Sequence, residues 1–115
     1  MVMKEYVPDA GDVVWVDFTP QAAQEKAGRR PAVVLSPQLY NEKAGLAVLC
    51  PITSHAKGYP FEVAIPGALA VRGVILADQL KSLDWRRRQV QRFGKIPATV
   101  LDTLLRRVAA LLGIA

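Results

Sequence analysis

Two apolar segments separated by a long loop constrain the fold of this chain most strongly. Residues 12–18 are β-branched and aromatic, which predicts a strand. Residues 31–36 form a short continuous apolar run that fits a buried strand or a piece of buried helix, and its proline and β-branched residues favour the strand. The Gly/Ala-rich loop between them carries Glu25, Arg29 and Arg30. Because long loops held by rigid strands commonly carry function, we expect chemistry here, with Arg30 fixed more firmly than Glu25 by the second strand.

Further short apolar segments predict a small, strongly curved and mostly antiparallel sheet. The additional strands are expected at residues 46–53, 61–65, 74–77 and 89–93. Pro51 cannot donate a backbone hydrogen bond, so its strand is expected to be bulged or unpaired near the end, aiming Thr53 and Ser54 away from the sheet. Five or six short strands with one terminal helix predict a mainly β domain that also contains α-helix.

Two helices are expected, a short one between strands and a longer one near the end of the chain. The short helix covers residues 37–43, with Ser36 as its N-cap and Gly45 as its stop. The longer helix begins at Pro97 and ends at Gly113, because apolar residues recur at helical spacing between them. Its apolar stripe, expected to pack on the sheet or on a partner subunit, consists of Val100, Leu101, Leu104, Leu105, Val108, Leu111 and Leu112. Its water-facing residues are Asp102, Arg106 and Arg107.

The composition bounds the class of protein and its partners. A chain of 115 residues suits one domain, and its net charge of +5 suits a polyanionic partner, although a basic surface that confers solubility alone is the alternative. Cys50 is the single cysteine, which excludes an intramolecular disulfide and fits a buried thiol in a reducing cytosol. Residues 1–9 contain no apolar signal core, and no run approaches the roughly 20 apolar residues that span a bilayer. We therefore expect a soluble, cytoplasmic protein.

Four sequence blocks occur in the order and spacing of a known family. They are G-D-V-V-W-V-D-F followed by E-x-A-G-x-R-P-A-V-V-L-S-P within residues 11–37, P-I-T-S at 51–54, K-G-Y-P-F-E-V at 57–63 and A-D-Q-L-K-S at 77–82. With these blocks the chain resembles the MazF/PemK family of toxin endoribonucleases over nearly its whole length. The resemblance implies a single toxin endoribonuclease domain over residues 1–115 that forms a homodimer. It also implies a small SH3-like barrel, of the type shared with the CcdB gyrase poison, with roughly five to seven strands and a C-terminal helix.

Three residues match the catalytic positions of that family. Cleavage of RNA by its own 2′-hydroxyl needs a base, a group that stabilises the phosphate and a proton source for the leaving 5′-oxygen. The chain has a single histidine, His55, which excludes a two-histidine mechanism. Glu25, Arg30 and Thr53 fall where the family places its catalytic glutamate, arginine and threonine. The resemblance therefore implies that Arg30 stabilises the phosphate, that Thr53 donates to a non-bridging oxygen, and that Glu25 is the base or positions Arg30.

The same resemblance points to substrate-binding residues around these three. They are Phe18, Arg29, Ser54, Lys57, Asp78, Gln79 and Lys81. Asp78 and Gln79 are expected to read base edges, which single-stranded RNA exposes. The three arginines at 86–88 suit a phosphate backbone or the acidic tail of an antitoxin, or else only a solvated basic surface. Trp15 and Trp85 are of a kind that stacks on bases, but packing in the core is favoured for Trp15.

Different classes of function remain in competition. The leading hypothesis is a sequence-specific endoribonuclease toxin that cuts single-stranded mRNA to 2′,3′-cyclic phosphate and 5′-hydroxyl ends and is neutralised by an acidic antitoxin. It needs no cofactor and no metal, since one histidine, one cysteine and scattered carboxylates form no ligand cluster of recognisable spacing. The alternative is a non-enzymatic, CcdB-like toxin that poisons DNA gyrase, and a former toxin that serves as a repressor subunit is a third hypothesis. The joint presence of Glu25, Arg30 and Thr53 favours the enzyme.

Overall fold

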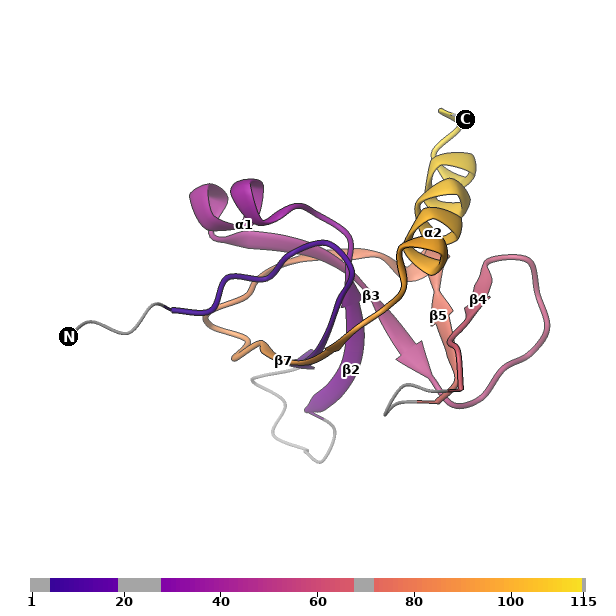
Figure 1. Ribbon diagram of the computed structural model, residues 1–115, viewed down its shortest axis with the longest axis horizontal. Helices are drawn as coiled ribbons and strands as arrows, with labels where there is room; N and C mark the ends of the chain where they lie inside the picture. Colours follow the sequence, from indigo (N-terminus) through magenta and orange to yellow (C-terminus); the bar gives the residue numbers. More distant parts are fainter. Residues whose placement is uncertain (1–4, 19–27, 68–71, 115) are drawn as a thin grey trace.

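The computed structural model describes residues 5–18, 28–67 and 72–114, which form a curved antiparallel sheet with helices packed against it (Figure 1). The strands are β1 (Asp12–Asp17), β2 (Arg29–Val34), β3 (Leu46–Thr53), β4 (Glu62–Ala64), β5 (Val74–Leu76), β6 (Lys81–Asp84) and β7 (Gln91–Lys95). The helices are α1 (Gln38–Ala44), the 3-10 helix η1 (Ala77–Gln79) and α2 (Ala98–Leu111). Within the described ranges, no helix is both long enough and apolar enough to cross a membrane.

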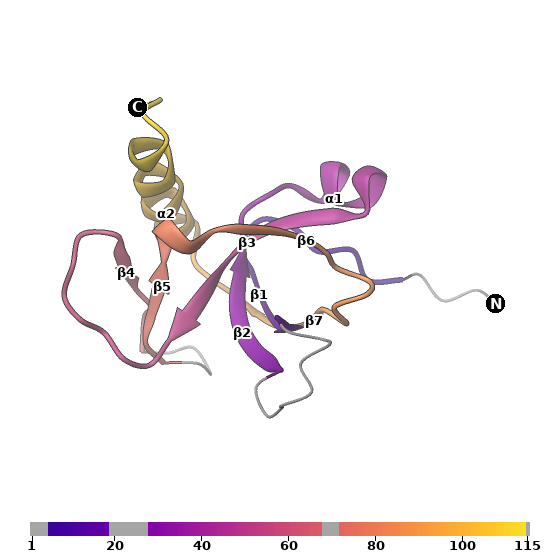
Figure 2. The ribbon, with the colours of Figure 1, turned by 180° about the vertical axis from the view of Figure 1, so that it is seen from behind.

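The strand order gives a seven-stranded sheet, β4-β5-β3-β2-β1-β7, with β6 also paired to β3. Figures 1 and 2 show how strongly the sheet curves, with α2 standing beside β4 and β5 and α1 near the other end of β3. In the part of the chain that the structure describes, the end strands β4 and β7 do not pair with each other, so the sheet is not closed. The predicted fold class, mainly β with a C-terminal helix, is confirmed.

Parts of β1 and β2 are apolar on consecutive residues because both of their faces are covered there. Val13 and Val33 belong to one buried cluster, which Leu104 of α2 completes. Val14 and Val34 point the other way, into a second buried cluster. Since successive side chains of a strand point to opposite faces, a strand with both faces buried contains no polar alternation. The strand expected at 31–36 is confirmed, although it begins earlier, at Arg29.

Strand β3 is the centre of the sheet, because β2 pairs with one of its edges and β6 and β5 follow one another along the other. Val48 pairs with Ser82 of β6, and Ile52 pairs with Ile75 of β5. Between these two ladders the chain leaves the edge as η1 and then returns. Strand β6 was missed by the sequence pattern, because only Leu83 of its four residues is buried.

The predicted short helix is present as α1, but its first cap differs from the expectation. Pro37 occupies the N-cap position and makes no side-chain cap bond, so the prediction that Ser36 caps the helix is wrong. The Ser36 hydroxyl instead donates to Asn41 Oδ1 at 2.6 Å and accepts from the backbone N–H of Val48 at 2.8 Å. It therefore fastens α1 to β3. Gly45 ends the helix with a φ of 72°, a left-handed conformation that glycine adopts without strain.

The terminal helix α2 covers one end of the sheet. Leu104 and Val108 are its buried residues, whereas Leu105, Leu111 and Leu112 of the predicted stripe are exposed. The expectation that Arg107 faces water is wrong, because its guanidinium donates to backbone carbonyls in the segment that leads into β4. Arg107, on the polar face predicted for the helix, thus connects α2 to the sheet by hydrogen bonds.

Candidate active site

Arg30 of β2 and Thr53 of β3 stand at the place where these two strands separate. The pairing of β2 with β3 ends at Ala32 and Pro51, and that register continued by two residues would place Arg30 opposite Thr53. Pro31 lacks the N–H that the next rung of this ladder would need, because hydrogen-bonded pairs alternate along the ladder in which Leu35 donates to Val48. Beyond this point β2 pairs only with β1, while β3 pairs with β5. The two strands therefore open into a gap with Arg30 on one side and Thr53 on the other.

The register also corrects the expectation for the end of β3. Pro51 does not produce a bulge, since the pairing register between β2 and β3 is uninterrupted up to it. Thr53 remains in the strand and pairs with Val74 of β5, so the prediction that it leaves the sheet is wrong. Ser54, directly after the strand, is exposed. Proline is tolerated because, on the other edge of β3, Pro51 lies between the end of the β6 ladder at Leu49 and the start of the β5 ladder at Ile52.

A cavity of about 550 Å³ occupies this gap. Six residues predicted from the sequence lie in its wall: Phe18, Arg30, Thr53, Ser54, Gln79 and Lys81. The remaining lining residues are Pro31, Pro51, Ile52, His55, Arg72 and Leu76. Among the described residues that line it, the permanently charged ones are all basic, and no carboxylate takes part. The cavity is therefore suited to an anion.

The charged side chains of the cavity are open to solvent. Arg30 is exposed and forms no ion pair with any carboxylate in the described ranges. The Lys81 ammonium, at the first residue of β6, lies 5.6 Å from the centre of the Phe18 ring. This cation–π contact orients the ammonium without neutralising it. Both positive charges thus remain available to a ligand.

The Thr53 hydroxyl is oriented by its neighbours along the chain. Its Oγ1 accepts a hydrogen bond from the backbone N–H of His55 at 3.1 Å. Because that bond uses a lone pair of the oxygen, the hydroxyl proton stays free to be donated to a ligand. The Ser54 hydroxyl lies 3.3 Å from Nδ1 of the His55 ring. Three successive polar side chains therefore line this side of the cavity.

A second, smaller cavity of about 260 Å³ adjoins the first, since Thr53 and Gln79 line both. Lys57, another predicted substrate residue, lies here together with Tyr59 and Glu62. The loop that forms it is held by the Glu62 carboxylate, which accepts the backbone N–H groups of Lys57 and Gly58, each at 2.8 Å.

The Tyr59 phenol in the smaller cavity is held in its neutral form. Desolvation raises the pKa of Tyr59, and the nearby carboxylates of Asp78 and Glu62 raise it further. A neutral phenol can donate a hydrogen bond while its ring offers a flat apolar face. The smaller cavity thus differs from the larger one in combining an aromatic ring with a carboxylate.

Three of the predicted site residues are not placed in these cavity walls. Glu25 lies outside the described residues. Arg29 binds Asp17, with 3.2 Å between Nη1 and Oδ1, and also donates to the Gln89 carbonyl at 2.9 Å. Asp78 is half-buried, and within the described ranges its Oδ1 atom is buried without a hydrogen-bond partner.

The single cysteine is buried behind the site, as the sequence predicted. Cys50 is fully buried in β3, and its Sγ lies 3.9 Å from the carbonyl oxygen of Ala77. Desolvation raises the pKa of the Cys50 thiol to about 12, and the charge of Asp78 contributes further. The thiolate is the nucleophilic form, so Cys50 is inert at neutral pH.

The two tryptophans differ in burial, and the one expected in the core is the exposed one. Trp15 is 36% exposed and stacks on Phe93 with 4.7 Å between the ring centres, so the prediction that it packs in the core is wrong. Trp85 is buried, and its indole N–H donates to the Asn41 carbonyl at 2.9 Å. Neither tryptophan lines the larger cavity.

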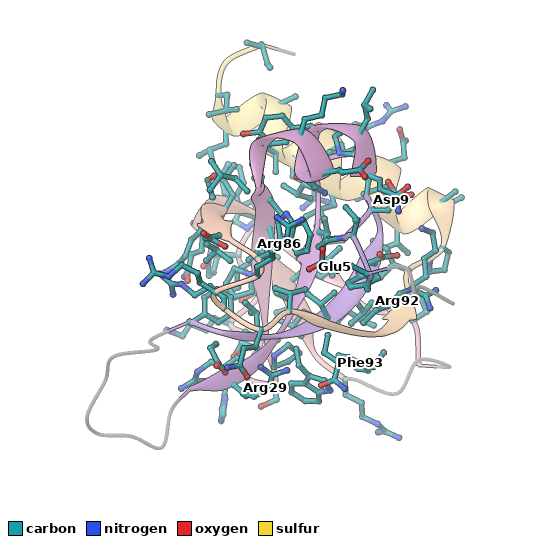
Figure 3. All side chains as sticks on the ribbon, turned by 90° about the vertical axis from the view of Figure 1, so that its left-hand side faces the viewer. Glu5, Asp9, Arg29, Arg86, Arg92 and Phe93 are labelled. Atoms are coloured by element: carbon teal, nitrogen blue, oxygen red, sulfur yellow. The ribbon has the colours of Figure 1, made fainter. Side chains whose placement is uncertain are left out.

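Two of the three consecutive arginines at 86–88 have structural partners for their side chains. Arg86 forms an ion pair with Glu5, with 3.0 Å between Nε and Oε2, and lies 4.2 Å above the Trp85 ring (Figure 3). Arg88 donates to the carbonyls of Asp17 and Phe18, at 3.1 and 2.6 Å. These bonds hold the end of β1, from which Phe18 enters the cavity.

Sequence reasoning missed Arg72, Tyr59 and Glu62. Tyr59 and Glu62 belong to a block recognised in the sequence, yet nothing in their spacing predicts a cavity. Arg72 follows no such block, and only the pairing of β3 with β5 brings it to the site. Within the described residues, no group of three His, Cys, Asp or Glu side chains is placed to hold a metal ion.

Comparison with known proteins gives concordant matches. The family described as "PemK-like, MazF-like toxin of type II toxin-antitoxin system" matches residues 9–112. The endoribonuclease toxin MazF of Escherichia coli is 46% identical over 112 residues, covering 97% of this chain and 100% of that protein. The crystal structure of MazF from Deinococcus radiodurans has a TM-score of 0.86 and 55% identity, covering 95% of this chain and 99% of that one. A MazE-MazF crystal structure from the same organism has a TM-score of 0.86 and 50% identity, covering 96% and 100%.

The fold and the cavity define a small, mainly β protein with an open site between two diverging strands, whose charged lining residues, among those described, are basic. The family match extends over nearly all of the strands and helices that build this site. The chain belongs to the family of PemK-like, MazF-like toxins of type II toxin–antitoxin systems.

Proposed function

We propose that this protein is an endoribonuclease toxin that cleaves single-stranded RNA in the cytoplasm and is neutralised by a cognate antitoxin. The observation that carries the proposal is the matching register of Arg30 and Thr53 on either side of a cavity whose permanently charged lining residues, in the described part of the chain, are basic. Similar proteins are named endoribonucleases, and similar structures were solved as MazE-MazF complexes. A gyrase-binding, CcdB-like function has no support in these comparisons.

In the proposed reaction, the 2′-hydroxyl of the RNA attacks the adjacent phosphorus and the bond to the 5′-oxygen breaks. Arg30 stabilises the negative charge that develops on the phosphate, because a guanidinium is always protonated and presents a fork of donors. Thr53 donates its free hydroxyl proton to a non-bridging oxygen. Glu25 accepts the 2′-hydroxyl proton or positions Arg30, and a proton passes to the leaving 5′-oxygen. The products carry 2′,3′-cyclic phosphate and 5′-hydroxyl ends.

The proposed substrate contacts follow the walls of the two cavities. Phe18 and Lys81 offer a ring and a charge in the larger cavity, and Ser54 and Gln79 offer hydrogen-bonding groups. Lys57 extends the binding surface into the smaller cavity. Single-stranded RNA is bound by such combinations of stacking, base-edge contacts and positive charge. Arg29 and Asp78 contact the RNA only after their side chains have moved, since Arg29 is ion-paired and Asp78 is half-buried.

We also propose that the toxin acts as a homodimer. Apolar side chains remain exposed near the end of α2, where Leu112 and Ile114 are 58% and 75% exposed, and Trp15 is exposed on β1. Such side chains are commonly covered in an oligomer. Analytical ultracentrifugation should give twice the mass of the 12.5 kDa chain, and a sedimenting monomer at micromolar concentration would contradict this part of the proposal.

The function is tested by incubating the purified protein with a defined single-stranded RNA and identifying the product ends. We expect site-specific cuts that leave 2′,3′-cyclic phosphate and 5′-hydroxyl ends and that proceed in EDTA. A 2′-deoxy substitution at the cleaved nucleotide should abolish cutting, because the nucleophile is removed. Cleavage of the deoxy substrate, or loss of activity in EDTA, would point to a metal-dependent nuclease instead.

A further inference from the structure

Arg72 contributes a positive charge to the larger cavity that neither the family blocks nor the proposed reaction accounts for. It lines the same cavity as Arg30 and Lys81. Its side chain is exposed, and within residues 5–18, 28–67 and 72–114 it forms no ion pair. Since the described lining residues also include no carboxylate, this arginine is available to a ligand.

The backbone next to Arg72 is fixed against Thr53. Gly73 has a φ of 126°, and a Cβ atom built there would lie 2.0 Å from the carbonyl oxygen of Thr53. Only glycine allows the chain to pass so close. The carbonyl of Gly73 accepts from the N–H of Ile65 at 3.2 Å, and Val74 pairs with Thr53. Arg72 therefore directly precedes Gly73, whose backbone packs against Thr53, the proposed catalytic threonine.

The described residues supply more positive charge to the cavity than the single charge of the scissile phosphate requires. Arg30, Arg72 and Lys81 are three permanent cations from three different parts of the chain, whereas an RNA phosphodiester carries one negative charge. Arg30 approaches from β2 and Arg72 from the chain that enters β5, so the two guanidinium groups belong to opposite sides of the gap between β2 and β3. Two phosphates, one on each side of the gap, match this placement of the two guanidinium groups better than a single phosphate does.

We propose that Arg72 binds the phosphate of a nucleotide that flanks the cleaved linkage, and thereby holds the RNA across the cavity. This inference rests on the proposed function, because it assigns a second phosphate of the same substrate. A guanidinium fork suits bidentate contact with a phosphate. Arg72 is thus a substrate-binding residue that affects the affinity for RNA and the position of the RNA along the cavity. It is separate from Arg30, which stabilises the reacting phosphate.

Binding is tested with an RNA that contains the cleavage site and carries a 2′-O-methyl group at the cleaved nucleotide. Arg72→Ala should raise the Kd about tenfold and should lower the slope of log Kd against log salt by about 0.7, the value for one phosphate contact on a single strand. The matched control is Arg106→Ala, which removes the same charge from an exposed ion pair with Asp102 on α2. Arg72→Lys should lie between Arg72→Ala and the wild type, because the charge remains and the fork is lost.

The contacted phosphate is identified by replacing one linkage at a time with an uncharged methylphosphonate. One flanking linkage should weaken binding to the wild type and leave binding to Arg72→Ala unchanged, while the other linkages should affect both proteins alike. In cleavage assays, Arg72→Ala should raise KM and leave kcat near the wild-type value. Equal affinities of Arg72→Ala and Arg106→Ala for RNA, with a wild type that cleaves normally, would overturn the inference and leave the proposed function standing. A wild type that neither binds nor cleaves RNA would refute the proposed function itself.

Discussion

Arg30 and Thr53 occupy matching register positions on neighbouring antiparallel strands, yet no ladder joins them. The ladder between β2 and β3 stops at Ala32 and Pro51, and each strand then follows a different neighbour. Ladder bonds and buried side chains fix the strands on both sides of the gap, so the two residues are held at its edges by the rigid sheet. Such preorganisation is what electrostatic catalysis requires of a donor.

The first prediction concerns Arg30. Arg30→Ala should reduce kcat by about 100- to 1000-fold, because losing one preorganised donor costs on the order of 3 to 4 kcal/mol in the transition state. Single-turnover cleavage of a defined RNA measures the effect, and circular dichroism and thermal unfolding should show an unchanged fold, since Arg30 is exposed. Arg30→Lys should retain part of the activity. Turnover equal to that of the wild type would exclude Arg30 from the chemistry.

The second prediction separates the two roles proposed for Glu25. Glu25→Gln keeps the shape of the side chain and removes its basicity, so a general base should lose roughly 10- to 1000-fold in rate. The pH profile of kcat/KM should then lose the ascending limb that belongs to this carboxylate. A lower rate with the limb retained would favour the positioning role, and an unchanged rate would remove Glu25 from the site.

The third prediction concerns the antitoxin. A cavity lined by Arg30, Arg72 and Lys81 is complementary to an acidic, disordered peptide that folds as it binds. Calorimetric titrations should show that such a peptide and a non-cleavable RNA exclude one another, and binding of both should weaken as salt rises. Co-expression of a short adjacent frame with an acidic end should restore growth. Simultaneous, independent binding of peptide and RNA would place the inhibitor elsewhere.

The fourth prediction tests the contact between Gly73 and Thr53. Gly73→Ala should lower the free energy of unfolding by roughly 2 to 4 kcal/mol, because a positive φ and a close backbone contact are both violated. Gly67→Ala is the matched control, since a Cβ at Gly67 has no neighbour within 4 Å. Urea unfolding of both variants measures the difference. Equal stability of the two variants would contradict the close contact between the Gly73 backbone and the Thr53 carbonyl.

The fifth prediction concerns alkaline pH. Desolvation raises the pKa of Cys50 from 9.0 to about 12 in the folded protein, so the folded state holds its proton more tightly than the unfolded state. The resulting stability is fully present below pH 9 and is lost progressively as the pH rises toward 12. Urea unfolding between pH 8 and 10 should therefore show a falling free energy of unfolding, with a slope that approaches about 1.4 kcal/mol per pH unit.

Cys50→Ala is the control for this pH dependence. The variant should be less stable at every pH, because a buried side chain is shortened, but its stability should fall less steeply between pH 8 and 10. Tyr6 also has a raised pKa, caused first by desolvation and then by its hydrogen bond to Asp12, and it contributes only above its unfolded pKa of 10.0. Parallel slopes for wild type and variant would contradict the burial of Cys50.

Local and patterned features of this protein were determined by the sequence. The continuous apolar run before Ser36 predicted a buried strand, and both faces of that strand are indeed covered. Gly45 predicted the end of α1, because the helix ends there in a left-handed backbone conformation that glycine adopts without strain. The ordered blocks named the family and, through it, the residues to examine. Helix-spaced apolar residues predicted α2, although they did not show which of them would be buried.

The tertiary structure decided which of these residues meet. Arg30 and Thr53 face one gap only because the pairing of β2 with β3 ends at Ala32 and Pro51, and Arg72 reaches the same cavity only because β5 pairs with β3 beside it. Arg88 and Arg107 donate hydrogen bonds to backbone carbonyls, and no sequence pattern indicates such bonds. From the sequence alone, both side chains therefore look solvent-exposed. Strand pairing and side-chain to backbone bonds join residues far apart in the chain, and no local pattern of charge or hydrophobicity encodes them.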